Sequence, residues 1–156
     1  MSSHNLLLDT GPFVVLVVGS VDPDLLGSAQ HLKQYEPESL LVLESFVSRF
    51  RSITITPHVA TETSYFLKKI GGTSGNRVVA KFVELLQWIR ERNVPSRAAA
   101  ARVEFAWLDL ADCTLLEGGR ARDTLLSTDA VLVNRRLELG LPAVNFNHLR
   151  EQAGLL

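Results

Sequence analysis

Two acidic residues come directly after segments that we predict to be strands. Asp9 follows the apolar run at 6–8, which is typical of a strand buried on both faces of a parallel sheet. Asp129 follows the strand predicted over 124–128. An ionised carboxylate at such a position must be hydrated, paired or bound to a metal, because burying a bare charge is very costly. Either residue could instead simply cap the helix that follows it, and both readings stay open here.

Two further acidic residues face the apolar side of predicted helices. Glu62 lies three residues after Val59 and four before Phe66, and this spacing places all three on one helix face. Asp112 repeats the pattern, with leucines at i−4, i+3 and i+4. The structural alternative is that Glu62 pairs with a nearby cation and that Asp112 belongs to a capping box begun by Asp109.

Together, the four carboxylates predict a cation site. A doubly wound sheet would bring the ends of its strands together, and carboxylates gathered there would repel one another unless a divalent cation neutralised them. Carboxylate oxygens suit hard cations such as Mg²⁺ or Mn²⁺. A zinc site is not expected, because the histidines are scattered along the sequence at His4, His31, His58 and His148.

Strands and helices alternate along the chain. Strands are predicted over 6–8, 52–56, 124–128 and 142–146. Helices are predicted from Pro12 onwards and over 38–50, 57–69, 77–92, 97–106, 110–117 and 130–139, with a loop at 71–76. This alternation predicts an α/β fold with three layers, α/β/α, around a central, mainly parallel sheet of four to five strands.

Length and composition limit the class of protein. The chain has 156 residues, 46% of them hydrophobic, which suffices for one domain with a sizeable core. The net charge of −1 excludes a whole-molecule attraction for nucleic acid, so any basic footprint must be local. The single cysteine, Cys113, suits a reducing compartment. Without a signal-peptide pattern or a run long enough to span a bilayer, we expect a cytoplasmic protein that does not enter the membrane.

The segments around the four acids resemble the conserved acidic segments of PIN-domain ribonucleases. These segments are 7–10, 56–62, 110–113 and 125–132, and 140–146 resembles the final strand of that family. The resemblance implies a single PIN-like nuclease domain over 1–156, a four-acid Mg²⁺ or Mn²⁺ site and endonucleolytic cleavage of single-stranded RNA. Many members are the toxin of a toxin–antitoxin pair, so an antitoxin protein is an implied partner. Two departures are a long segment at 19–52 and the lack of a further Asp soon after Asp129.

The resemblance assigns roles to the acids. Asp9, Asp112 and Asp129 would hold the metal directly, and Glu62 would bind a second metal or orient the attacking water. Asp109 competes with Asp112 as the third acid, but we expect it to cap the helix at 110–117. Supporting polar groups are expected from Thr10, Thr128 and Asn134.

Basic residues near the acids are candidates to hold the RNA backbone, because an acidic cleft by itself repels RNA. The candidates are Lys68, Lys69, Arg77, Lys81, Arg120, Arg122, Arg135 and Arg136. The apolar stripe of the helix at 77–92 is wider than one core contact needs, which predicts a homodimer. The alternative to a ribonuclease is a non-catalytic protein of the same fold that serves as an RNA-interaction module.

Overall fold

The strands form one parallel sheet. The computed structural model describes residues 4–156, so residues 1–3 of the predicted domain lie outside the described part. The strands are β1 (Asn5–Leu8), β2 (Ser52–Ile55), β3 (Arg90–Glu91), β4 (Asp123–Ser127) and β5 (Ala143–Asn145). Their order across the sheet is β3-β2-β1-β4-β5, and every neighbouring pair is parallel.

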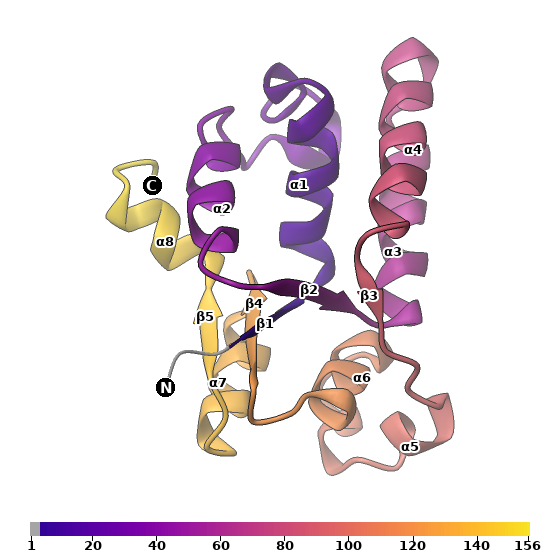
Figure 1. Cartoon of the computed structure of the whole chain (residues 1–156), viewed down its shortest axis with the longest axis vertical. Coiled ribbons are helices and arrows are strands. Elements are labelled where there is room, and N and C mark those ends of the chain that lie inside the picture. The colour runs from indigo at the N-terminus through magenta and orange to yellow at the C-terminus, as the bar shows by residue number, and fades with distance from the viewer. Residues whose placement is uncertain (1–3) are drawn as a thin grey trace.

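Helices cover both faces of this sheet. They are α1 (Thr10–Val21), α2 (Ser39–Val47), α3 (Pro57–Lys68), α4 (Gly72–Leu86), α5 (Ser96–Ala100), α6 (Leu110–Gly118), α7 (Ala130–Glu138) and α8 (Phe146–Gln152). Figure 1 shows α1, α2, α3 and α4 on one side of the sheet and α5, α6 and α7 on the other. The predicted three-layer α/β/α class with a parallel sheet of four to five strands is therefore confirmed.

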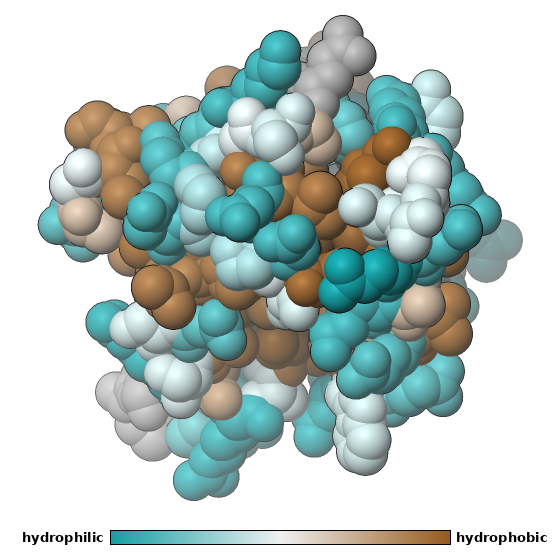
Figure 2. All heavy atoms as spheres, turned by 90° about the horizontal axis from the view of Figure 1, so that it is seen from above, coloured by the Kyte–Doolittle hydropathy of each residue, from teal (hydrophilic) through white to brown (hydrophobic). Residues whose placement is uncertain are grey.

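The core lies around β1, the central strand. All four of its residues are buried, which accounts for its unbroken apolar run. Helix α1 packs beside it and buries apolar side chains around most of its circumference, from Phe13 to Val18. Figure 2, which looks down on the molecule from above, shows hydrophobic surface interspersed with hydrophilic side chains.

The chain order places a switch point between β1 and β4. The sheet grows from β1 through β2 to β3 in one direction, and β4 and β5 then extend it from the other side of β1. Leu8 pairs with Leu126, and the Asp9 amide donates a hydrogen bond to the Leu126 carbonyl at 3.1 Å. Ligands of open α/β sheets bind outside the carboxyl ends of the strands at such a point. Asp9 and Asp129 both follow strands that end there.

The prediction was wrong at both ends of the helix expected over 77–92. Helix α4 begins at Gly72, inside the predicted loop, and ends at Leu86. Gly71 and Gly72 have positive φ values of 69° and 66°, so the glycines make the turn into the helix rather than a longer loop. Beyond α4, β3 pairs with β2 over only two exposed residues, which is too short for an alternating pattern to reveal.

Two other segments differ from the prediction. The helix expected over 97–106 is divided into α5 and a 3₁₀ turn at Val103–Ala106. Glu104, inside the 3₁₀ turn, is buried and accepts hydrogen bonds from Arg102 and Arg135, which draws the chain inward there. The sequence interpretation also missed α8, which begins directly after β5.

The apolar stripe of α4 is largely used inside the chain. Val78 and Phe82 are buried in the core, whereas Val83 is 53% exposed. Trp88, just beyond the helix, is 81% exposed. Among the helices of residues 4–156, none combines the length and apolar character that crossing a membrane requires.

Candidate active site

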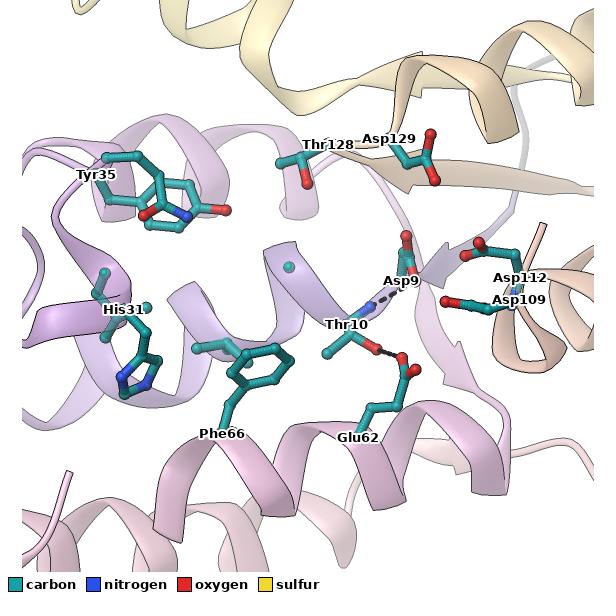
Figure 3. A pocket seen from close by; sticks show the side chains of 14 residues that line it. Asp9, Thr10, His31, Tyr35, Glu62, Phe66, Asp109, Asp112, Thr128 and Asp129 are labelled. Carbon is teal, nitrogen blue, oxygen red and sulfur yellow. Dashed lines mark hydrogen bonds between the residues drawn. The ribbon is translucent and has the colours of Figure 1, made fainter. Parts of the chain in front are cut away.

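A cavity of about 330 Å³ opens at the switch point of the sheet. Its lining contains five carboxylates and, among the described residues, no lysine or arginine. The carboxylates belong to Asp9, Glu62, Asp109, Asp112 and Asp129. In Figure 3 they lie together at one end of the cavity, on side chains that come from α3, α6 and the ends of β1 and β4. The structure thus places all four predicted acids, and the competing Asp109, in one site.

Asp9 is the most enclosed of the five acids. It is 7% exposed, and its two carboxylate oxygens accept hydrogen bonds from the Thr10 amide at 2.8 Å and the Ser127 hydroxyl at 2.6 Å. Burial raises the pKa of Asp9 to about 6, although these hydrogen bonds lower it and the charges of Glu62 and Asp109 raise it further. Asp9 therefore caps α1 and also faces the cavity, so the cap does not exclude a role in the site.

Glu62 reaches the site from the second turn of α3. Thr10 donates a hydrogen bond from its hydroxyl to Oε1 of Glu62 at 2.7 Å, as Figure 3 shows. Burial raises the pKa of Glu62, the Thr10 hydrogen bond opposes this, and the charge of Asp109 adds to it. Thr10, predicted as a supporting residue, thus holds the Glu62 carboxylate in place beside Asp9.

Asp112 and Asp109 both come from the start of α6. Asp109 caps the helix as predicted, since its side chain accepts a hydrogen bond from the Asp112 amide at 2.9 Å. Asp112 is 8% exposed. Burial, followed by the charges of Asp9, Asp109 and Asp129, raises the pKa of Asp112 to about 8. The neighbouring negative charges disfavour ionisation of Asp112, whereas a bound cation would favour it. Asp112 is therefore a suitable ligand for a cation that enters the cavity.

Asp129 closes the acidic end of the cavity. Its Oδ1 caps α7 by accepting from the amides of Val131 at 2.9 Å and Leu132 at 3.3 Å, while its own amide donates to the Ser127 hydroxyl at 2.9 Å. Among residues 4–156, no hydrogen bond or ion pair engages Oδ2 of Asp129. Thr128, predicted as a supporting residue, also lines the cavity.

Gly11 lets α1 start close to the end of β4. A Cβ atom on Gly11 would lie 2.9 Å from Oγ1 of Thr128, which is closer than real Cβ contacts allow. A side chain at this position would therefore require the Thr128 hydroxyl, which lines the cavity, to shift.

Several predicted residues lie away from this site. Asn134 is exposed on α7 and does not line the cavity, so its predicted supporting role is not borne out by its position. Arg120 and Arg122 precede β4, and because all strands are parallel they lie at the sheet edge opposite the acids. Arg136 is buried and donates to the backbone carbonyls of Arg120, Asp123 and Pro142, so it holds the fold rather than facing a ligand.

The remaining basic candidates differ in their surroundings. Arg135 is paired with Glu104 and Glu138. Lys81 is paired with Glu84 at 3.2 Å. Lys68 and Arg77 are exposed on α3 and α4 without lining the cavity.

Lys69 lies closest to the cavity among these candidates, because its Nζ atom sits 5.0 Å from the ring centre of Phe66, a lining residue. The same atom lies 4.4 Å from the ring centre of Tyr65. Lys69 is therefore the basic candidate best placed to contact a ligand that extends out of the cavity.

The sequence interpretation missed part of the lining. Ser127 links Asp9 to the backbone of Asp129 and was not singled out, because a serine within a strand carries no signal of its own. The segment at 19–52, noted only as long, contributes His31 and Tyr35 to the far end of the cavity. Polar, turn-rich sequence does not indicate where such a segment packs.

The donor set fits a hard divalent cation. Within residues 4–156, no three acidic, histidine or cysteine side chains already surround one point closely enough to enclose an ion. Mg²⁺ does not need such a cage, since it usually keeps several waters and is held by one or two carboxylates together with substrate phosphates. An open cavity lined by carboxylates suits this mode of binding.

Two comparisons, with protein families and with curated proteins, give no match. A scan against protein-family models finds no family that matches this chain, and a search of the curated proteins finds no matching sequence. The resemblance to PIN-domain ribonucleases therefore stays a prediction from the sequence motifs.

Proposed function

We propose that this chain is a ribonuclease of the PIN-domain type, which hydrolyses phosphodiester bonds in single-stranded RNA with the help of Mg²⁺ or Mn²⁺. The observation that carries the proposal is the gathering of five carboxylates in one cavity whose described lining has no lysine or arginine. Helix caps alone would not require the caps of three helices and a half-buried glutamate from a fourth to share one cavity. The site demands a positive charge, and a phosphodiester is the substrate that such a charge would attract.

The carboxylates and the groups that orient them would have different roles in this reaction. The cation would be held by carboxylates from among Asp9, Asp112 and Asp129, together with waters and the substrate phosphate. When bound, it would withdraw charge from the phosphate and make a water more acidic. Ser127 and the Thr10 amide fix the orientation of the Asp9 carboxylate. Glu62, held by Thr10, is placed to accept a proton from the attacking water or to hold a second ion. Burial raises the pKa of Glu62, which is the direction that favours proton uptake by a general base.

Further partners belong to the same proposal. RNA would reach the cavity along α3, where Lys69 offers a positive charge next to Phe66. We also propose that the protein works in the cytoplasm, in keeping with its single free cysteine, Cys113, which is buried. An antitoxin that blocks the cavity remains an implication of the family resemblance.

The first test is the metal dependence of RNA cleavage. Purified protein should cut a single-stranded RNA of mixed sequence with Mg²⁺ or Mn²⁺ and should stop when EDTA is added, because the carboxylates alone repel the phosphate. Single-stranded DNA and double-stranded RNA of the same sequence serve as comparison substrates. RNA that binds without being cut at any metal concentration would favour the non-catalytic interaction module instead.

The predicted homodimer can be tested at Val83, which is exposed on α4. Val83→Asp should weaken a dimer formed through this helix, because it places a charge in an apolar contact, and sedimentation velocity should show the shift. Val131→Asp is the matched control, since Val131 is equally exposed but lies on α7. A wild-type protein that sediments as a monomer at high micromolar concentration would end the dimer proposal.

A further inference from the structure

The cavity continues beyond the carboxylates to an aromatic end. His31, Tyr35 and Phe66 line this part, and Figure 3 shows them on the side away from Asp9 and Asp112. The proposed hydrolysis uses only the acidic end. The aromatic end therefore needs an explanation of its own.

The rings at this end are held in place. Phe66 and His31 are stacked, with ring centres 5.8 Å apart and planes inclined by 24°. Tyr35 is buried, and its ring packs against Phe146, with ring centres 6.3 Å apart. The guanidinium of Arg150 lies 4.9 Å from the Tyr35 ring centre and supports this ring from behind the cavity. Such pre-set rings can receive a flat partner with little loss of side-chain freedom.

Helix α3 connects the two ends on a single face. Glu62, Phe66 and Lys69 follow one another at i, i+4 and i+7, so one helix face carries an acid, a ring and a cation in that order. The rise of an α-helix separates Glu62 from Phe66 by about 6 Å along the axis. A phosphate at the carboxylates would thus have its own sugar and base beside Phe66, with Lys69 beyond them.

We propose that the end of the cavity formed by His31, Tyr35 and Phe66 is a subsite for a nucleobase, which belongs to the nucleotide whose phosphate lies at the carboxylates. This inference rests on the proposed function and adds what the site recognises. Base faces stack on aromatic side chains in single-stranded nucleic-acid sites, and this stacking tolerates every base. The cavity volume of about 330 Å³ falls within the range of small-ligand pockets.

The chemistry of the lining favours one base over a second phosphate. The described lining of the cavity holds no lysine or arginine, so a polyphosphate would find nothing there to neutralise it. Lys69 is placed outside, against Phe66, where the next phosphate of a strand would leave the cavity. The order of acid, ring and cation along α3 therefore matches the phosphate, the base and the next phosphate of one nucleotide within an RNA strand.

The test compares two probes that differ only by a base. Binding of 5′-AMP and of ribose 5-phosphate to the full chain is measured by calorimetry in the presence of Mn²⁺. We expect 5′-AMP to bind about tenfold or more tightly, in line with the contribution of one stacked base. Phe66→Leu should remove most of this preference, because leucine keeps the apolar volume and loses the ring.

Two further variants make the comparison specific. Tyr65→Leu is the matched control, since Tyr65 is the neighbouring aromatic residue on α3 but is 65% exposed and does not line the cavity. It should leave the preference for 5′-AMP unchanged. His31→Ala should lower the preference for 5′-AMP over ribose 5-phosphate, as Phe66→Leu does. It replaces Phe66→Leu in the test if a thermal melt shows that Phe66→Leu is unfolded.

Cleavage assays separate this inference from the proposed function. With an RNA that carries one abasic ribose at the cleaved position, wild type and Phe66→Leu should cut at the same reduced rate. Equal binding of 5′-AMP and ribose 5-phosphate by a wild-type protein that still cleaves RNA would overturn the subsite and leave the ribonuclease standing. A base preference that depends on Phe66 in a protein that cuts no RNA would support the subsite and refute the ribonuclease.

Discussion

Asp129→Asn is expected to lower the rate of RNA cleavage by at least about 100-fold at saturating Mn²⁺. The substitution removes a charge from the cation site, and interactions of this kind contribute several kcal/mol to catalysis, where about 1.4 kcal/mol corresponds to tenfold in rate. The fold should survive, because asparagine caps helices nearly as well as aspartate and the amides of Val131 and Leu132 keep their acceptor. The rate is measured under single-turnover conditions on a labelled single-stranded RNA.

The matched control for this variant is Asp24→Asn. Asp24 is exposed, lies outside the cavity and follows the end of α1, so its charge should not affect the rate. Glu62→Gln should also lose activity, since glutamine can still accept the hydrogen bond from Thr10 but can neither take up a proton nor bind a cation well. An Asp129→Asn protein that cuts as fast as wild type would show that the activity belongs to another site or to a contaminant.

Asp112→Asn is expected to raise the melting temperature of the metal-free protein at pH 7. At pH 7 folding requires Asp112 either to take up a proton or to keep its charge beside three other acids, and asparagine avoids both costs. A relief equal to one pKa unit is about 1.4 kcal/mol, which corresponds to about 3–6 °C for a chain of this size. Asp112 is a sharper choice than Asp9, because both oxygens of Asp9 accept hydrogen bonds that asparagine could not keep together.

The same variant has a predictable dependence on pH. The pKa of Asp112 is about 8 in the folded chain against an ordinary value of 3.8, so the folded state binds this proton more tightly than the unfolded state. Wild-type stability should therefore fall as the pH rises from about 4 to about 8. The melting temperature of Asp112→Asn minus that of wild type should be near zero at pH 4 and should grow up to about pH 8.

Melting in the presence of Mn²⁺ tests whether Asp112 also binds the cation, in addition to repelling its acidic neighbours. At a hundredfold excess over its dissociation constant, Mn²⁺ should stabilise the wild type by about 2.7 kcal/mol, or about 5–11 °C. Asp112→Asn should start from the higher metal-free baseline and lose most of that shift. A variant that is less stable in EDTA and keeps the full Mn²⁺ shift would identify Asp112 as a structural residue.

Local sequence patterns were enough to predict the four acids and most of the elements that carry them. Asp9 was found because it directly follows a fully apolar strand, and Glu62 because its neighbours at i−3 and i+4 are apolar. Both signals come from positions close in the chain, where strand and helix periodicity determine which side a residue faces. The capping role of Asp109 was predictable for the same reason.

Contacts between distant segments were not predictable in this way. The Ser127 hydroxyl donates a hydrogen bond to Asp9, which lies 118 residues earlier in the chain. The residues around Ser127 give no indication of this contact. The two residues of β3 form a strand only because β2 offers them backbone partners. Arg136 looked like a surface cation, but the carbonyls that surround it bury it completely.

The sequence by itself determined that carboxylates would stand at the ends of strands and on the inner faces of helices. The tertiary structure alone decided that Asp109 would join them in one cavity and that the cavity would continue to His31, Tyr35 and Phe66. The physical reason is that the two kinds of feature depend on residues at different distances along the chain. Periodicity and capping depend on a few neighbouring residues, whereas the shape of the cavity depends on how the segment at 19–52 packs against α3, and that packing has no local signature.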